Sequence, residues 1–195
     1  RGHQDDWIFL DRSQCDLMNP EQTHRIFQEI QPQAVVHMAG VVPGFYNIDR
    51  VASFSHNVTI NENVLSAAHQ ANVQKMLVGL SVNMFGDKPS KLPLDESMIF
   101  EGHISGPFAG YGYSKRMLEL QCQNYNQQYG RQYFGIIPCN IYGPNDNLKS
   151  GRLIPNLILK FLEAQKNQTD VVINGTGKPL RQFINSLDLA AIIIK

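Results

Sequence analysis

The chain has 195 residues, of which 43% are hydrophobic and 17% charged, a balance typical of one globular domain able to bury a core. Basic and acidic residues both number 17, so the charge argues against nucleic acid as a partner. No run of about 18 apolar residues and no signal-peptide pattern occurs, so we expect no membrane partner. The three cysteines have no C-x-x-C spacing, which argues against disulfides and structural zinc and favours a reducing, cytoplasmic setting.

Short apolar runs alternate with helical patterns along the chain, which is typical of parallel strands joined by crossover helices. We therefore predict an α/β fold. Strands are expected over residues 7–10, 34–40, 75–81, 134–138 and 171–173. One helix is expected to begin near residues 19–21, with Asn19 as its N-cap and Pro20 as its first helical residue. Further helices are expected over residues 57–70, 111–129, 154–165 and 186–195. Residues 87–110 are expected to form a polar loop and residues 140–144 a turn.

Tyr111 and Lys115 are four residues apart at the start of a predicted helix, so both side chains lie on one face. A nearby ammonium group stabilises a phenolate, which predicts a lowered pKa for Tyr111 and a role in proton transfer near neutral pH. Alone, this spacing also fits a solvated helix surface. Ser81 strengthens the catalytic interpretation because it ends a predicted strand, where its hydroxyl can hydrogen-bond a substrate carbonyl beside the tyrosine.

Three further blocks make a family resemblance specific. Residues 36–40 read VHMAG, residues 138–147 read PCNIYGPNDN, and residues 175–184 read GTGKPLRQFI. With Ser81, Tyr111 and Lys115, they resemble extended short-chain dehydrogenases/reductases, and specifically the GDP-L-fucose synthase family. The resemblance runs from about Trp7 to Ile194. It implies a Rossmann-like, doubly wound parallel sheet with helices on both faces.

The resemblance implies that Ser81, Tyr111 and Lys115 reduce the 4-keto group of a GDP-linked nucleotide sugar, with Lys115 also touching the nicotinamide ribose. Asn140 is expected near nicotinamide and substrate, and Arg181 at the sugar-nucleotide diphosphate, although Arg181 also fits a surface ion pair. Arg12, Asp16 and Ala39 are the other expected cofactor residues. Arg12 favours NADP through the 2′-phosphate, whereas neighbouring Asp11 suits the 2′-hydroxyl of NAD. Because the family uses NADPH, NADP is the expected cofactor and NAD the less favoured one.

The sequence departs from the family at two positions that face the substrate. Asn83 stands where the family has a cysteine, and Arg152 where it has a histidine, the two residues that move protons during 3,5-epimerisation. Neither an amide nor a guanidinium exchanges protons near neutral pH. We therefore expect Asn83 and Arg152 to bind substrate while the epimerase step is impaired.

The chain is also expected to be truncated at both ends. Residues 1–150 are assigned to a cofactor-binding domain without its first glycine-rich unit, and residues 151–195 to the start of the substrate-binding part. No histidine has metal-ligand spacing, so no metal is expected. The family implies a homodimer. Two alternatives remain: an epimerase, reductase or dehydratase for another nucleotide sugar, and a catalytically reduced relative that acts as a structural or assembly subunit.

Overall fold

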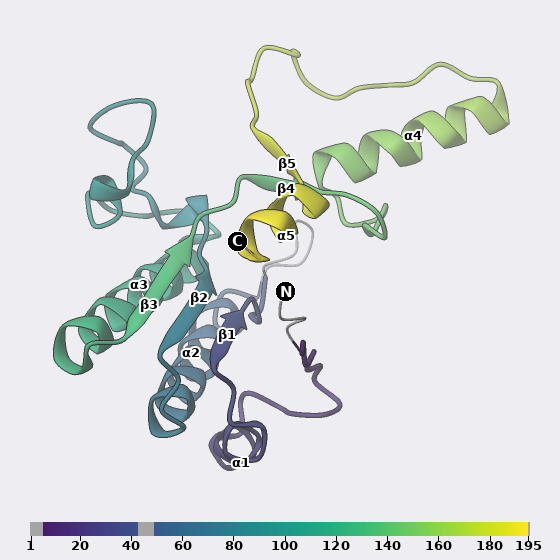
Figure 1. Ribbon diagram of the computed structural model, residues 1–195. Helices are drawn as coiled ribbons and strands as arrows, with labels where there is room; N and C mark the ends of the chain where they lie inside the picture. The colour runs from purple at the N-terminus through teal and green to yellow at the C-terminus, as the bar shows by residue number, and fades with distance from the viewer. Residues whose placement is uncertain (1–5, 43–48, 195) are drawn as a thin grey trace.

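The computed structural model describes residues 6–42 and 49–194, and its centre is a three-stranded parallel sheet (Figure 1). The strands β1 (Ala34–His37), β2 (Lys75–Gly79) and β3 (Gln132–Ile136) lie in that order. Val36 pairs with Leu77, and Leu77 pairs with Phe134, so these three residues lie side by side across the parallel sheet. Parallel neighbours need long crossover connections, and helices provide them here. The predicted α/β class with a parallel sheet is confirmed.

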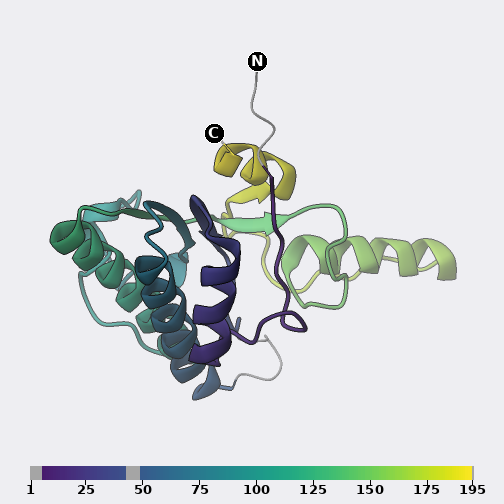
Figure 2. The same ribbon diagram turned by 60° about the horizontal axis from the view of Figure 1, so that its bottom comes forward.

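Three helices form a layer on one face of this sheet. The helices α1 (Pro20–Ile30), α2 (Ala52–Gln70) and α3 (Ala109–Tyr129) lie side by side (Figures 1 and 2). Their inner sides and the facing strand residues make the core, whose most buried members include Val64, Leu65, Ala68, Met76, Val78, Leu118 and Tyr133. This layer fixes α3 against the carboxyl end of β2.

Capping residues in the sequence predicted the start of α1 and the end of α3 correctly, but the start of α2 was predicted too late. The Asn19 side chain accepts a hydrogen bond from the Gln22 backbone N–H at 3.1 Å, and Pro20 is the first helical residue, as predicted. Helix α3 ends at the left-handed C-cap Gly130, also as predicted. Helix α2 begins at Ala52, five residues before the predicted start at Asn57.

The opposite face of the sheet carries exposed apolar side chains. Phe134 is 54% exposed and Val36 is 37% exposed, although strands of this composition are usually covered on both faces. The predicted strand over residues 7–10 is wrong for the described chain: the segment is extended but is not assigned to a sheet. A strand requires a neighbour to accept its backbone hydrogen bonds, and residues 7–10 are exposed instead.

A second, smaller sheet joins segments far apart in sequence. Strand β4 (Asn140–Tyr142) pairs in parallel with β5 (Phe183–Asn185), and between them the helix α4 (Leu153–Asn167) projects away from the α1–α3 layer (Figures 1 and 2). The pairing crosses the expected domain boundary at residue 150. Residues 140–144 are therefore not only a turn, and residues 171–173 are not a strand. Helix α5 (Ser186–Ile194) follows β5; Lys195, its predicted last residue, lies outside the described residues.

Two short 3-10 helices complete the elements near the carboxyl edge. η1 (Val82–Met84) directly follows Ser81, and η2 (Glu96–Met98) lies inside the connection that leads to α3. Met98, Ile99 and Ile104 of this connection are buried, so the predicted polar loop also contributes to the core. Among the described residues, no helix combines the length and the apolar composition needed to cross a membrane.

Candidate active site

The candidate site lies at the carboxyl ends of the parallel strands, where ligands bind in open α/β sheets. Ala39 and Gly40 follow β1, and Ser81 follows β2. Tyr111 and Lys115 come from the first turns of α3, which packs against η1. The arrangement brings the three residues predicted to be catalytic to one place.

Tyr111 and Ser81 interact directly. A side-chain hydrogen bond with Ser81 lowers the pKa of the Tyr111 phenol, but burial raises it more, so the net pKa lies above the usual value. The predicted lowering of this pKa is therefore wrong, because the phenol is removed from water and the Lys115 ammonium does not hydrogen-bond to it. The Tyr111 phenol is thus protonated at neutral pH and can donate its proton.

Lys115 is only 4% exposed, and its position is set by the backbone rather than by a carboxylate. Its ammonium donates to the Gly79 carbonyl at 2.6 Å and lies 5.7 Å from the centre of the Tyr111 ring. Burial lowers the pKa of Lys115 to about 8. Lys115 therefore keeps its positive charge at neutral pH, close to the Tyr111 ring.

A buried asparagine organises the turn after β1. The Asn57 side chain accepts from the Val41 backbone N–H at 2.7 Å and donates to the Val41 carbonyl at 2.9 Å. A Cβ on Gly40 would lie 2.8 Å from the Asn57 Oδ1 and 3.9 Å from the Lys115 Nζ. Only glycine leaves this space open. The sequence analysis did not include Asn57 or Gly40 among the site residues, although Asn57, a polar residue at the start of the helix expected over residues 57–70, was a usable signal.

His37, in the same strand end, has a structural role. Its Nε2 lies 3.1 Å from the Asn61 Oδ1, and burial lowers its pKa to about 4. His37 is therefore uncharged at neutral pH, as expected for a buried imidazole held by one amide. Among the described residues, no group of three or more His, Cys, Asp or Glu side chains is arranged to hold a metal ion.

The two residues that depart from the family are placed on different elements. Asn83 lies in η1, two residues after Ser81, and its backbone N–H donates to the Ser81 Oγ at 3.3 Å. Arg152 is the N-cap of α4, where its guanidinium forms an ion pair with Asp146 and donates to the Ile141 carbonyl at 3.2 Å. These contacts hold the Arg152 guanidinium beside β4.

Asn140 lies in the small sheet, and Arg181 lies shortly before its second strand. Asn140 begins β4, and its Nδ2 donates to the Gln182 carbonyl at 3.0 Å. Arg181 precedes Gln182, is exposed, and donates to the carbonyl of its neighbour Leu180 at 2.9 Å. Its guanidinium remains accessible to an anionic ligand.

The residues expected at the adenine end of the cofactor lie before α1. The Arg12 side chain is 86% exposed, and its guanidinium lies 3.7 Å from the Asp16 carboxylate. Asp16 also accepts a hydrogen bond from the Met18 backbone N–H at 3.1 Å, which fixes the loop just before α1. The Asp11 carboxylate, considered above for the 2′-hydroxyl, accepts from Ser13.

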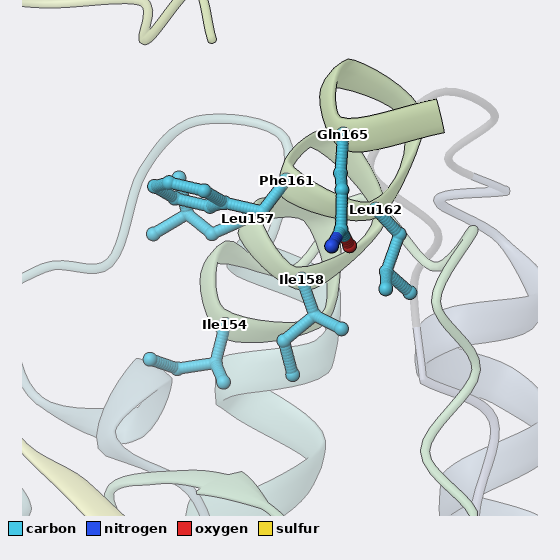
Figure 3. Close-up of a pocket in the computed structure, with 6 residues that line it drawn as sticks. All are labelled: Ile154, Leu157, Ile158, Phe161, Leu162 and Gln165. Carbon is cyan, nitrogen blue, oxygen red and sulfur yellow. The ribbon is translucent and has the colours of Figure 1, made fainter. Parts of the chain in front are cut away.

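An apolar groove lies apart from these residues, along α4. Its lining consists of Ile154, Leu157, Ile158, Phe161, Leu162 and Gln165, all from one helix (Figure 3). The groove offers almost no polar group and contains none of the residues predicted to react. The candidate active site is therefore the cluster at the carboxyl edge of the three-stranded sheet.

Comparison with known proteins identifies the family of this chain. A model of the family described as "NAD dependent epimerase/dehydratase family" matches residues 1–195. The chain is 44% identical over 194 residues to GDP-L-fucose synthase of Dictyostelium discoideum, and 34% identical over 192 residues to GDP-L-fucose synthase of Escherichia coli (strain K12). These alignments cover 97% and 96% of this chain but 60% of each relative. The chain thus spans about three fifths of their length.

A solved structure supports the same relationship in three dimensions. The crystal structure of a GDP-L-fucose synthetase from Naegleria fowleri bound to NADP superposes with a TM-score of 0.87 at 34% identity. The match covers 96% of this chain and 63% of that one. The predicted Rossmann-like fold of the extended short-chain dehydrogenases/reductases is therefore confirmed.

Proposed function

Because the chain belongs to the NAD dependent epimerase/dehydratase family, we propose that it forms part of an NADP-dependent enzyme that reduces the 4-keto group of a nucleotide sugar. The cluster of Ser81, Tyr111 and Lys115 carries this proposal. It combines a protonated phenol, a hydroxyl hydrogen-bonded to it and a buried cation, which together can bind and protonate a developing alkoxide.

The described residues fit the nicotinamide half of such a cofactor. NADPH, when bound, supplies the hydride for ketone reduction. Lys115 would hold the ribose beside Ala39 and the open space at Gly40, and Asn140 would contact the nicotinamide. The NADP named with the Naegleria fowleri structure supports the choice of NADP over NAD.

Arg12 tests the choice of cofactor. If its exposed guanidinium pairs with the 2′-phosphate, Arg12→Ala should weaken NADPH binding by about tenfold or more and leave NADH binding nearly unchanged, since only NADPH loses a charge-assisted contact. Fluorescence titration with both cofactors measures this. Arg25→Ala is a matched control, because Arg25 also forms an exposed ion pair four residues along, with Glu29. Equal losses for NADPH and NADH would show that Arg12 has a structural role.

We propose a GDP-linked 4-keto-6-deoxy sugar as the substrate, because GDP-L-fucose synthases recur among the relatives. Arg181 would bind the diphosphate, for which a planar guanidinium is well suited. Asn83, Asn140 and Arg152 would line the sugar. The small sheet supports this assignment, because it brings Asn140 next to the segment that carries Arg181.

The domain assignment follows from this division of roles. Residues 1–150 hold the cofactor and residues 151–195 begin the substrate-binding part. A homodimer would form through α2 and α3, where Phe54, Met117 and Leu120 line an apolar surface groove. The three free cysteines support a reducing, cytoplasmic location.

A second candidate function has one observation in its favour. The groups at Asn83 and Arg152 cannot shuttle protons, and Arg152 is already paired with Asp146. A relative that has lost its chemistry and serves as a structural or assembly subunit would tolerate both replacements. The retained cluster of Ser81, Tyr111 and Lys115 favours the enzyme instead.

An assay with keto sugars separates these candidates. The protein is incubated with NADPH and with GDP-linked or UDP-linked 4-keto-6-deoxy sugars, and NADPH oxidation is followed by absorbance. We expect oxidation with the GDP-linked sugar and much less with the UDP-linked one. A preference for the UDP-linked sugar would assign another nucleotide-sugar reductase, and no oxidation with either would favour the structural subunit.

A further inference from the structure

Helix α3 contacts the end of β2 and the segment after it at successive points along the helix. Lys115 donates to the Gly79 carbonyl at 2.6 Å, and Tyr111 interacts with the Ser81 hydroxyl. These two contacts place the proton donor and its partner. They do not hold the residues that follow Ser81.

The next contact is a close approach at Gly112. A Cβ at this position would overlap the Asn83 carbonyl oxygen, and it would lie 3.1 Å from the Ile104 side chain. The backbone of η1 therefore rests directly on α3 beside Tyr111. Any larger residue at Gly112 would push η1, and Ser81 with it, away from the helix.

Arg116 holds the same segment one helical turn further on. It is 8% exposed, and its guanidinium donates to three backbone carbonyls: Met84 at 2.6 Å, Glu101 at 2.7 Å and Gly102 at 2.9 Å. The carbon of the Arg116 guanidinium lies 5.6 Å from the centroid of the Tyr113 ring. Met84 ends η1, and Glu101 and Gly102 lie further along the connection that leads to α3. One side chain thus ties both ends of residues 84–102 to α3.

We propose that Arg116 is a positioning residue for the active site: it fixes η1, and with it Ser81 and Asn83, at the distance from Tyr111 that the reaction needs. The catalytic part of this role depends on the proposed ketone reduction. The guanidinium suits the task because its planar fork reaches three acceptors at once, which a lysine ammonium on a flexible stem cannot do in the same geometry. Since the Met84 residue is buried, losing the fork leaves an unpaired carbonyl at the end of η1.

Arg131 provides a matched control at the opposite edge of the sheet. Its guanidinium donates to the Asn72 side chain at 2.8 Å and to the His69 carbonyl at 3.3 Å, and so ties the end of α2 to the start of β3. Arg131→Lys removes a similar fork without touching η1. The Arg131→Lys variant therefore measures how much the loss of a comparable set of guanidinium hydrogen bonds lowers stability without displacing η1.

The test compares Arg116→Lys, Gly112→Ala and Arg131→Lys with the parent. Hydrogen–deuterium exchange is measured for peptides covering residues 82–103, together with kcat, KM and NADPH affinity. We expect Arg116→Lys to speed exchange in 82–103 by about tenfold or more. We expect kcat to fall by about ten- to a hundredfold, because small misplacements of reacting groups are costly. NADPH affinity should change little, since Lys115 keeps its contact with Gly79.

Gly112→Ala should reproduce the loss of kcat, because the added methyl group would push η1 away from α3. Arg131→Lys should leave kcat within about twofold, as expected for a substitution far from the chemistry. Unchanged exchange in 82–103 for Arg116→Lys would overturn the proposal, and so would faster exchange with an unchanged kcat. If the parent reduces no keto sugar, the proposed function fails, and the exchange measurement still decides whether Arg116 holds η1.

Discussion

Tyr111→Phe is expected to lower kcat for keto-sugar reduction by about two to four orders of magnitude, the usual effect of removing a positioned acid. Burial keeps the Tyr111 phenol protonated at neutral pH, and its hydrogen bond with Ser81 holds it at the carboxyl edge of the sheet. Phenylalanine preserves the ring that packs there but removes the proton. The loss should therefore appear in kcat, while NADPH affinity remains close to that of the parent.

Tyr125→Phe is the matched control for this substitution. Tyr125 lies on the same helix but packs against His69, Tyr129 and Tyr133 at its far end. Its kcat should match the parent, and circular dichroism should show that both variants are folded. Equal activity of Tyr111→Phe and the parent would remove Tyr111 from the mechanism.

The second large effect concerns the hydrogens at C3 and C5 of the sugar. Asn83 has no titratable group, and a guanidinium such as that of Arg152, here paired with Asp146, stays protonated in proteins, so neither residue can exchange protons with a substrate carbon. Product formed in heavy water should therefore carry no deuterium at C3 or C5. Mass spectrometry of the product, with fragmentation to locate the label, measures this directly.

The double variant Asn83→Cys with Arg152→His serves as the positive control, because it restores the residue types that the resembled family uses. It should gain exchange at C3 and C5 if the aligned positions are correct. Two deuterons incorporated by the parent at the rate of reduction would contradict the expected impairment. In that case another acid–base pair acts on the sugar, and His103, whose Nδ1 lies 2.8 Å from the Tyr113 hydroxyl, is the first to replace.

The parts of the fold that depend on residues close together in the sequence were predictable from it. The N-cap Asn19 and the i, i+4 pair of Tyr111 and Lys115 are local patterns, and the structure contains both. Ser81 follows a buried strand that was visible as an apolar run, so its place at the carboxyl edge of the sheet was predictable too.

Strand pairings between segments far apart in the sequence could not be predicted from such local patterns. Strand β5 was missed, and β4 was predicted as a turn, because their assignment depends on a partner about forty residues away. Residues 7–10 and 171–173 have strand-like composition but no strand assignment. A local pattern records the preference of a segment and does not identify its neighbour.

The electrostatics of the site also depended on tertiary structure. The spacing of Tyr111 and Lys115 suggested a lowered phenol pKa, whereas burial reverses the direction and Lys115 donates to Gly79 instead. Arg116 was likewise only a basic residue on a predicted helix. Its role became visible when the structure placed three carbonyls around its guanidinium.

The most direct measurement of ketone reduction follows a labelled hydride. The protein is supplied with NADPH that carries deuterium at the transferred position, together with a GDP-linked 4-keto-6-deoxy sugar in ordinary water. We expect one deuterium at C4 of the product, and a comparable loss of NADPH absorbance that Tyr111→Phe nearly abolishes. Product without deuterium at C4, or no product from a folded protein that binds NADPH, would contradict the assignment of this chain to a nucleotide-sugar reductase.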